Sequence, residues 1–143
     1  YIALAILELF PEFVNGIGLF HSTPIADSEE KKLARDKNIQ FVNQFGTDKF
    51  TKVLIPNLFA NTLNQDQIDA ALKIAQSSTS EGIINALNAM KNRPDRSQLL
   101  QNSQLANLII AGKKDPLIPY LSLITLASQM PLVQLNVLAE SSH

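Results

Sequence analysis

Two kinds of apolar pattern alternate along the chain. Short and nearly continuous apolar runs, which indicate buried strands, lie at residues 13–20, 105–111 and 133–138. In most of the longer segments apolar residues recur every three or four positions, as they do from Ile68 to Ala75, which is typical of an amphipathic helix. This spacing and the local start and stop signals predict helices over residues 1–10, about 29–45, 65–76, about 80–92 and 119–130.

The order of these elements predicts an α/β fold. A helix and a strand open the chain, the middle is helical only, and the last two strands are joined by a helix. Strands connected through helices form a parallel sheet by right-handed crossovers. We therefore expect three parallel strands with flanking helices and an inserted all-helical region. Asp27 or Ser28 is expected to cap the helix that begins at Glu29, Gly46 to end it, and Asn64 to cap the next one.

Polar residues follow each predicted strand at the edge where a parallel sheet binds its ligands. His21 follows the first strand, Asp115 lies just after the second, and His143 ends the loop after the third. An aspartate beside a histidine orients the imidazole and stabilises it once it is charged. We therefore take Asp115 and His143 as candidate catalytic residues. The neighbouring Phe20, His21, Pro116 and Leu117 are predicted to line a substrate pocket.

The charge of the chain excludes one class of function. Twelve lysines and arginines and thirteen acidic residues leave a net charge of −1, without a basic stripe that would bind a phosphate backbone. Nucleic-acid binding is therefore not expected. A hydrophobic fraction of 45% in 143 residues instead indicates about one globular domain with a substantial core.

Residue usage also limits the chemistry. The sequence has no cysteine, which excludes disulfides, thiolate catalysis and cysteine-bound zinc, and two histidines cannot form a histidine-rich metal site. Neither a metal nor another cofactor is expected. The longest apolar stretches, residues 1–7 and 117–126, are shorter than the roughly 20 residues that cross a bilayer. We expect no membrane segment and a cytoplasmic location.

Several motifs resemble one known family. The segment "AGKKDPLIPY" at residues 111–120, followed by a helix, a strand and a loop ending in His, resembles the acid and histidine segments of the α/β-hydrolase fold family. Residues 1–27 are similar to the family's stretch from the helix after the nucleophile elbow, through the sixth strand, into the cap. The segment "NRPDRSQLL" at residues 92–100 is similar to the return from a helical cap in esterases, lactonases and haloperoxidase-like members.

The resemblance implies a serine hydrolase that acts on an ester or a related acyl compound, with Asp115 and His143 in its catalytic triad. The nucleophile is then expected upstream of Tyr1. One residue departs from the family pattern, because the position before the histidine is commonly glycine and is Ser142 here. The implied organisation is a core helix and strand after the elbow at residues 1–26, a helical cap or lid at 27–96, and core strands carrying the acid and the histidine at 97–143.

The same comparison predicts the partners of the chain. We expect a small acyl substrate and the missing N-terminal half of the fold. Without that half the chain is expected to lack activity and to be partly unfolded, aggregated or oligomeric, so a homo-oligomer is among the expected states. Two alternatives stay open. The chain is a catalytically silent half that only binds its complement, or the upstream nucleophile is Asp, as in a dehalogenase or epoxide hydrolase.

Overall fold

The computed structural model describes residues 1–59 and 65–143, and the chain forms two compact units. Residues 1–25 and 94–143 form the first, called here the sheet unit. Residues 26–93 form the second, called the helical unit. The sheet unit therefore consists of two stretches of sequence that the helical unit separates.

Helices and strands alternate in the sheet unit. The chain order is α1 (Ile2–Leu9), the 3₁₀ helix η1 (Pro11–Phe13), β1 (Gly16–Phe20), α5 (Ser97–Gln101), β2 (Ala106–Gly112), α6 (Tyr120–Ala127) and β3 (Val133–Leu138). The predicted α/β class and the predicted strands are confirmed. The first strand begins later than predicted because proline at the first position of η1 starts a helical turn there.

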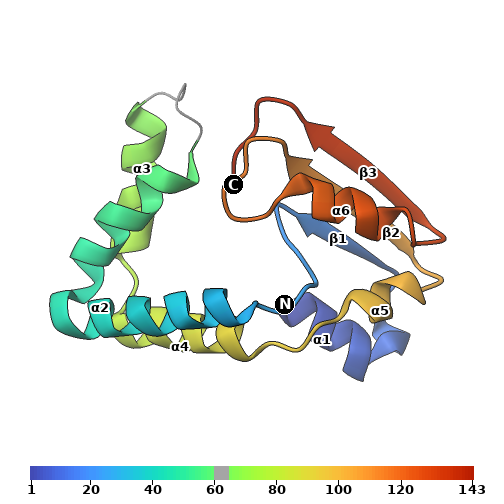
Figure 1. The fold of residues 1–143 in the computed structure, drawn as a ribbon, viewed down its shortest axis with the longest axis horizontal. Helices are drawn as coiled ribbons and strands as arrows, with labels where there is room; N and C mark the ends of the chain where they lie inside the picture. The colour runs from blue at the N-terminus through green and yellow to red at the C-terminus, as the bar shows by residue number, and fades with distance from the viewer. Residues whose placement is uncertain (60–64) are drawn as a thin grey trace. The chain divides into compact units, whose positions relative to one another are not determined.

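The three strands form one parallel sheet in the order β1-β2-β3, with all of its strands ending at the same edge (Figure 1). Phe20 pairs with Ile110, and Gly112 pairs with Leu138. The loops after β2 and β3 therefore leave the sheet from paired residues. This register brings the ends of two distant sequence segments together.

One face of the sheet carries the core of the sheet unit. Ile17 and Leu19 of β1 and Ile109 and Ala111 of β2 alternate with more exposed residues, and each is at most 8% exposed. Helix α6 lies along β2 and β3 (Figure 1). The helices contribute to the same cluster the buried residues Leu4, Leu7, Leu100, Leu123 and Leu126. Each fully buried leucine contributes about 1.5–3 kcal/mol through removal of apolar surface from water.

The chain leaves and re-enters the sheet unit at adjacent points. The amide of Arg96 donates a hydrogen bond to the carbonyl of Pro24 over 3.0 Å. Arg96 also pairs with Glu8 of α1, at 2.7 Å between Nη2 and Oε2. The connections to the helical unit are thus held together within the sheet unit.

The helical unit contains α2 (Glu29–Leu54), η2 (Ile55–Leu58), α3 (Gln65–Gln76) and α4 (Ser80–Asn92). Its core consists of Val42, Phe50 and Leu87, from α2 and α4. Ser28 caps α2, as its Oγ accepts from the amide of Lys31. The predicted cap Asn64 lies outside the described residues. None of the described helices is long and apolar enough to cross a membrane.

Asp27 has a different role from the predicted cap. Its buried carboxylate accepts hydrogen bonds from Arg35 Nε at 3.0 Å and from Arg93 Nη2 at 2.9 Å. Arg93 directly follows α4, so the two ends of the helical unit are joined by a buried ion pair. The pair is stabilised by hydrogen bonds from both guanidinium groups.

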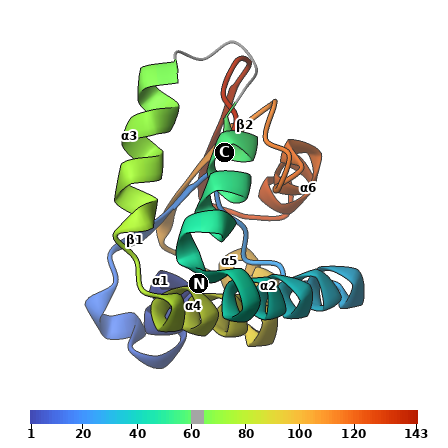
Figure 2. The same ribbon diagram turned by 90° about the vertical axis from the view of Figure 1, so that its left-hand side faces the viewer.

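Helix α2 changes direction at Gly46 (Figure 2). Gly46 has φ 79° and ψ 172°, a conformation that is essentially restricted to glycine. The prediction that the first helical segment ends there is confirmed, and a second segment that was not predicted follows from Thr47 to Leu54. The second segment brings Phe50 into the core of the helical unit.

Replacing Gly46 with alanine should lower the free energy of unfolding by about 1–3 kcal/mol, because Cβ is strained in this conformation. Urea unfolding measures the change. The control is Gln44→Ala at an exposed helical position two residues earlier, which should change stability by less than about 0.5 kcal/mol. Equal effects of the two substitutions would contradict the strain argument.

Candidate active site

Asp115 lies in the turn after β2, and both of its carboxylate oxygens are used. Oδ1 accepts hydrogen bonds from the amides of Leu117 at 2.7 Å and Ile118 at 2.9 Å, which is the usual way an aspartate stabilises a turn. Oδ2 accepts from Nδ1 of His143 at 2.8 Å. The side chain is only 1% exposed. One oxygen therefore stabilises the turn while the other holds the histidine.

The surroundings of Asp115 keep it ionised. Burial raises the pKa of the carboxyl, but the hydrogen bond from His143 lowers it, and those from the Ile118 and Leu117 amides lower it further. The net result is a pKa below the ordinary aspartate value. Asp115 is consequently a carboxylate at neutral pH. It accepts a hydrogen bond from the imidazole without taking the proton.

The contact with Asp115 determines which nitrogen of His143 can act as a base. Because a carboxylate only accepts hydrogen bonds, Nδ1 of the neutral ring carries the proton, and Nε2 is left with a lone pair. No hydrogen bond to Nε2 occurs within residues 1–59 and 65–143, and the side chain is 28% exposed. The predicted contact is present. Its catalytic role stays a prediction.

Position 112 requires glycine because neighbouring atoms leave no room for a Cβ. Its φ is not in the left-handed region, but a Cβ there would lie 2.5 Å from the carbonyl oxygens of Ser141 and Ser142 and 2.9 Å from Cε1 of His21. The loop after β3 is held against this position by a hydrogen bond from the Lys114 amide to the Ser141 carbonyl at 3.0 Å. A glycine at the end of β2 thus allows three segments to meet.

Ser142 takes the place where the resembling family commonly has glycine. Its backbone does not adopt a positive φ, so this turn does not require glycine. The residue is buried, and its hydroxyl points to the carbonyl of Lys114 at 3.5 Å. The serine therefore fits the turn that leads to His143.

His21 lies closer to Asp115 than its place in the sequence suggested. Its side chain is only 9% exposed, and Nδ1 is 3.8 Å from Oδ2 of Asp115. Nε2 lies 3.4 Å from Oγ of Ser141. The pattern of apolar and polar residues contains no signal for Ser141 as a neighbour of His21, because the contact joins segments 120 residues apart.

The other predicted pocket residues surround these groups at the surface. Phe20 is 67% exposed, and its ring contacts that of His21 edge to face, with centroids 4.8 Å apart. Pro116 is exposed, and Leu117 is 44% exposed. The structure places all of them beside the Asp115 turn or the end of β1. Their contact with a substrate stays a prediction.

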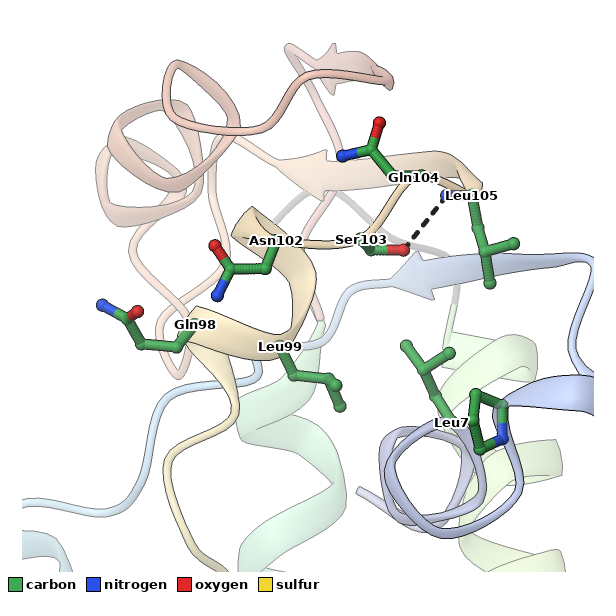
Figure 3. Close-up of a pocket in the computed structure, with 8 residues that line it drawn as sticks. Leu7, Gln98, Leu99, Asn102, Ser103, Gln104 and Leu105 are labelled. Carbon is green, nitrogen blue, oxygen red and sulfur yellow. Dashed lines mark hydrogen bonds between the residues drawn. The ribbon is translucent and has the colours of Figure 1, made fainter.

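A separate hollow lies at the opposite end of β2 (Figure 3). It has a volume of about 370 Å³, and Figure 3 shows leucines from α1, from α5 and from the residue before β2, together with amide side chains. It is lined by Leu7, Pro11, Gln98, Leu99, Asn102, Ser103, Gln104 and Leu105. Since Leu105 precedes β2 and Asp115 follows it, this hollow is not part of the Asp115 site. Among the described residues no cluster of three or more acidic or histidine side chains is arranged to hold a metal ion.

The fold matches solved hydrolase structures. A thermophilic esterase from Thermogutta terrifontis superimposes with a TM-score of 0.91 at 24% identity, over 100% of this chain and 54% of the esterase chain. An esterase from Exiguobacterium antarcticum gives 0.86 at 22% identity, over 99% of this chain and 55% of its own. The enol-lactonase from Burkholderia xenovorans LB400 gives 0.78 at 15% identity, over 96% and 53%.

These similarities define the class of fold. The chain has the C-terminal part of the α/β-hydrolase fold, as the sequence motifs indicated. It spans about half the length of the solved structures that it matches. No protein-family model and no curated protein sequence matches it.

Proposed function

We propose that this chain carries the acid and the histidine of a serine hydrolase that acts on an ester or a related acyl substrate. The 2.8 Å contact between Asp115 Oδ2 and His143 Nδ1, made at the ends of adjacent parallel strands, supports the proposal most directly. The structural similarity to esterases and to an enol-lactonase supports the substrate class.

In this mechanism His143 moves the protons. Nε2 removes the proton from the nucleophilic serine while the serine oxygen attacks the acyl carbon, and the ionised Asp115 stabilises the imidazolium that forms. The imidazolium then gives its proton to the leaving alcohol, and water, activated in the same way, releases the acid from the acyl-enzyme. The route uses neither a metal ion nor an organic cofactor.

The rest of the fold supplies the nucleophile in this proposal. We place the serine and the oxyanion hole upstream of Tyr1 in the full-length protein, in the part of the α/β-hydrolase fold that this chain does not include. Apolar side chains on the sheet face away from the core are exposed, among them Phe20, Leu108 and Leu138, and they offer a surface for that part. We assign the helical unit to a lid over the substrate.

A labelling experiment tests the proposed function. The full-length protein should hydrolyse p-nitrophenyl acetate and butyrate, and a fluorophosphonate should label one serine upstream of Tyr1 and abolish the activity. His143→Ala should slow labelling as well as hydrolysis, because both require the base.

Three outcomes would contradict the proposed mechanism. Label on Ser22, the serine that directly follows His21, would identify a different nucleophile. Hydrolysis without any labelled serine would favour an aspartate nucleophile, as in dehalogenases and epoxide hydrolases. A full-length protein that neither hydrolyses these esters nor reacts with the probe would mean that the segment has no part in serine hydrolysis.

A further inference from the structure

His21 has a conformation and an environment that the proposed mechanism does not use. It has φ 44°, the one positive φ among the described residues other than glycine. Its amide donates to the carbonyl of Ile110 at 2.9 Å, so the turn follows directly on the last pairing of β1. Histidine tolerates this left-handed region better than most residues do. The turn directs the ring away from solvent, toward Asp115.

The groups around His21 determine which ring nitrogen carries the proton of the neutral imidazole. Among the described residues Nδ1 has no hydrogen-bond partner, and Oδ2 of Asp115 lies 3.8 Å from it. A lone pair on Nδ1 would face a carboxylate, which is repulsive, whereas a proton there is attracted to it. With the proton on Nδ1, Nε2 can accept from the Ser141 hydroxyl. The favoured neutral ring therefore turns its N–H edge toward Asp115.

Oδ2 of Asp115 thus faces two imidazoles. A carboxylate oxygen has room for two donors, and the second donor need not displace His143. At 3.8 Å the contact is longer than a hydrogen bond, so its effect is electrostatic and steric. The ring also fills the space beside Gly112, where the loop carrying His143 passes.

We propose that His21 is a positioning residue, which holds the Asp115 carboxylate and the Ser141 loop so that Oδ2 stays aligned with Nδ1 of His143. The inference rests on the proposed function, because its effect is exerted through that pair. The ring is too buried to offer much surface to a substrate, so it acts on turnover rather than on substrate binding.

The charged groups around His21 are few. Asp115 faces it from the loop after β2, and Ser141 faces it from the loop after β3, which also carries His143. Glu140 on the same loop is paired with Lys114 instead. Within the described part of the chain the carboxylate is thus the charged partner through which His21 acts.

Three substitutions in the full-length protein separate the roles of the ring. His21→Gly keeps the backbone conformation and removes the ring, and it should lower kcat for p-nitrophenyl butyrate about tenfold with KM within about twofold of wild type. His21→Asn tolerates the same φ and places an amide N–H near the position of Nδ1, so kcat should return to within about threefold of wild type. His21→Gln places its amide toward Ser141 instead and should resemble His21→Gly.

A double-mutant cycle with Asp115→Asn distinguishes positioning from general stability. In the Asp115→Asn protein, His21→Gly should change kcat by less than about twofold, because the group through which it acts has lost its charge. An equal loss in both backgrounds would overturn the proposal and indicate a structural role only. A raised KM with unchanged kcat would also overturn it, and would identify His21 as a pocket residue.

The outcome for His143 keeps the two proposals apart. If His143→Ala abolishes activity while His21→Gly leaves kcat unchanged, the positioning role fails and the proposed function stands. If His143→Ala leaves activity intact, the proposed function fails, and the positioning role fails with it.

Discussion

Replacing His143 with alanine in the full-length protein is expected to lower kcat for ester hydrolysis by at least about 10⁴-fold. In the proposed mechanism Nε2 takes the proton from the nucleophile, so without it only substrate binding and oxyanion stabilisation remain. Asp115→Asn should cost about 10⁴-fold, because an amide holds the ring in the wrong tautomer. Steady-state kinetics with p-nitrophenyl butyrate measure both losses.

Glu140→Gln is the matched control for these variants. Glu140 is an acidic residue of the loop that carries His143, but it is exposed, and hydrogen bonding and charge attraction from Lys114 lower its pKa. Its substitution should leave kcat within about twofold of wild type. A His143→Ala protein that retains more than a tenth of wild-type kcat would exclude this histidine as the general base.

The second large effect is expected from adding one methyl group at Gly112. A Cβ there would come within 2.5 Å of two carbonyl oxygens and 2.9 Å of His21, and a backbone carbonyl cannot move aside without moving its loop. Gly112→Ala should therefore lower the free energy of unfolding by about 1–3 kcal/mol or more. It should also lower kcat, because the displaced loop carries His143.

Gly18→Ala tests whether space is the cause. Gly18 lies on the neighbouring strand β1, and a Cβ there would meet no atom of residues 1–59 or 65–143 within 4 Å. Thermal and urea unfolding of the two variants should show a large loss for Gly112→Ala and a change of less than about 0.5 kcal/mol for Gly18→Ala. Similar losses of stability in the two variants would mean that the flexibility of the strands, and not the close approach of the loops, is the reason for glycine at position 112.

The sequence predicts the strands and the contact between Asp115 and His143 for one physical reason. Both residues follow buried strands joined by a single helix, and a parallel sheet brings the ends of such strands to one edge. Knowing the register was not necessary, because each loop is short. The 2.8 Å contact therefore follows from the topology of the sheet, and the order of strands and helices in the sequence is enough to predict that topology.

Other features depend on space or on strain, which periodicity does not report. The ring of His21 turns inward because His21 has a positive φ and because Gly112 has no side chain to occupy the space that the ring fills. The break at Gly46 has the composition of a helix end, and composition does not report that the segment after it packs Phe50 in the core of the helical unit. Helix α5 has five residues, too few for an apolar period to appear.

The hydrogen bond between the backbones of Pro24 and Arg96 has a consequence for how such a protein diversifies. The segment between these residues is an insertion whose two ends are already held together. Each doubling of its length therefore costs only about 0.6 kcal/mol in loop-closure entropy. Descendants of one ancestor can exchange the whole inserted segment at this point and keep the sheet, with its aspartate and histidine, unaltered. Under the proposed function, in which the helical unit is the lid, selectivity and reactivity then evolve on separate stretches of one gene, and the junction at Pro24 and Arg96 is where a laboratory graft should be made.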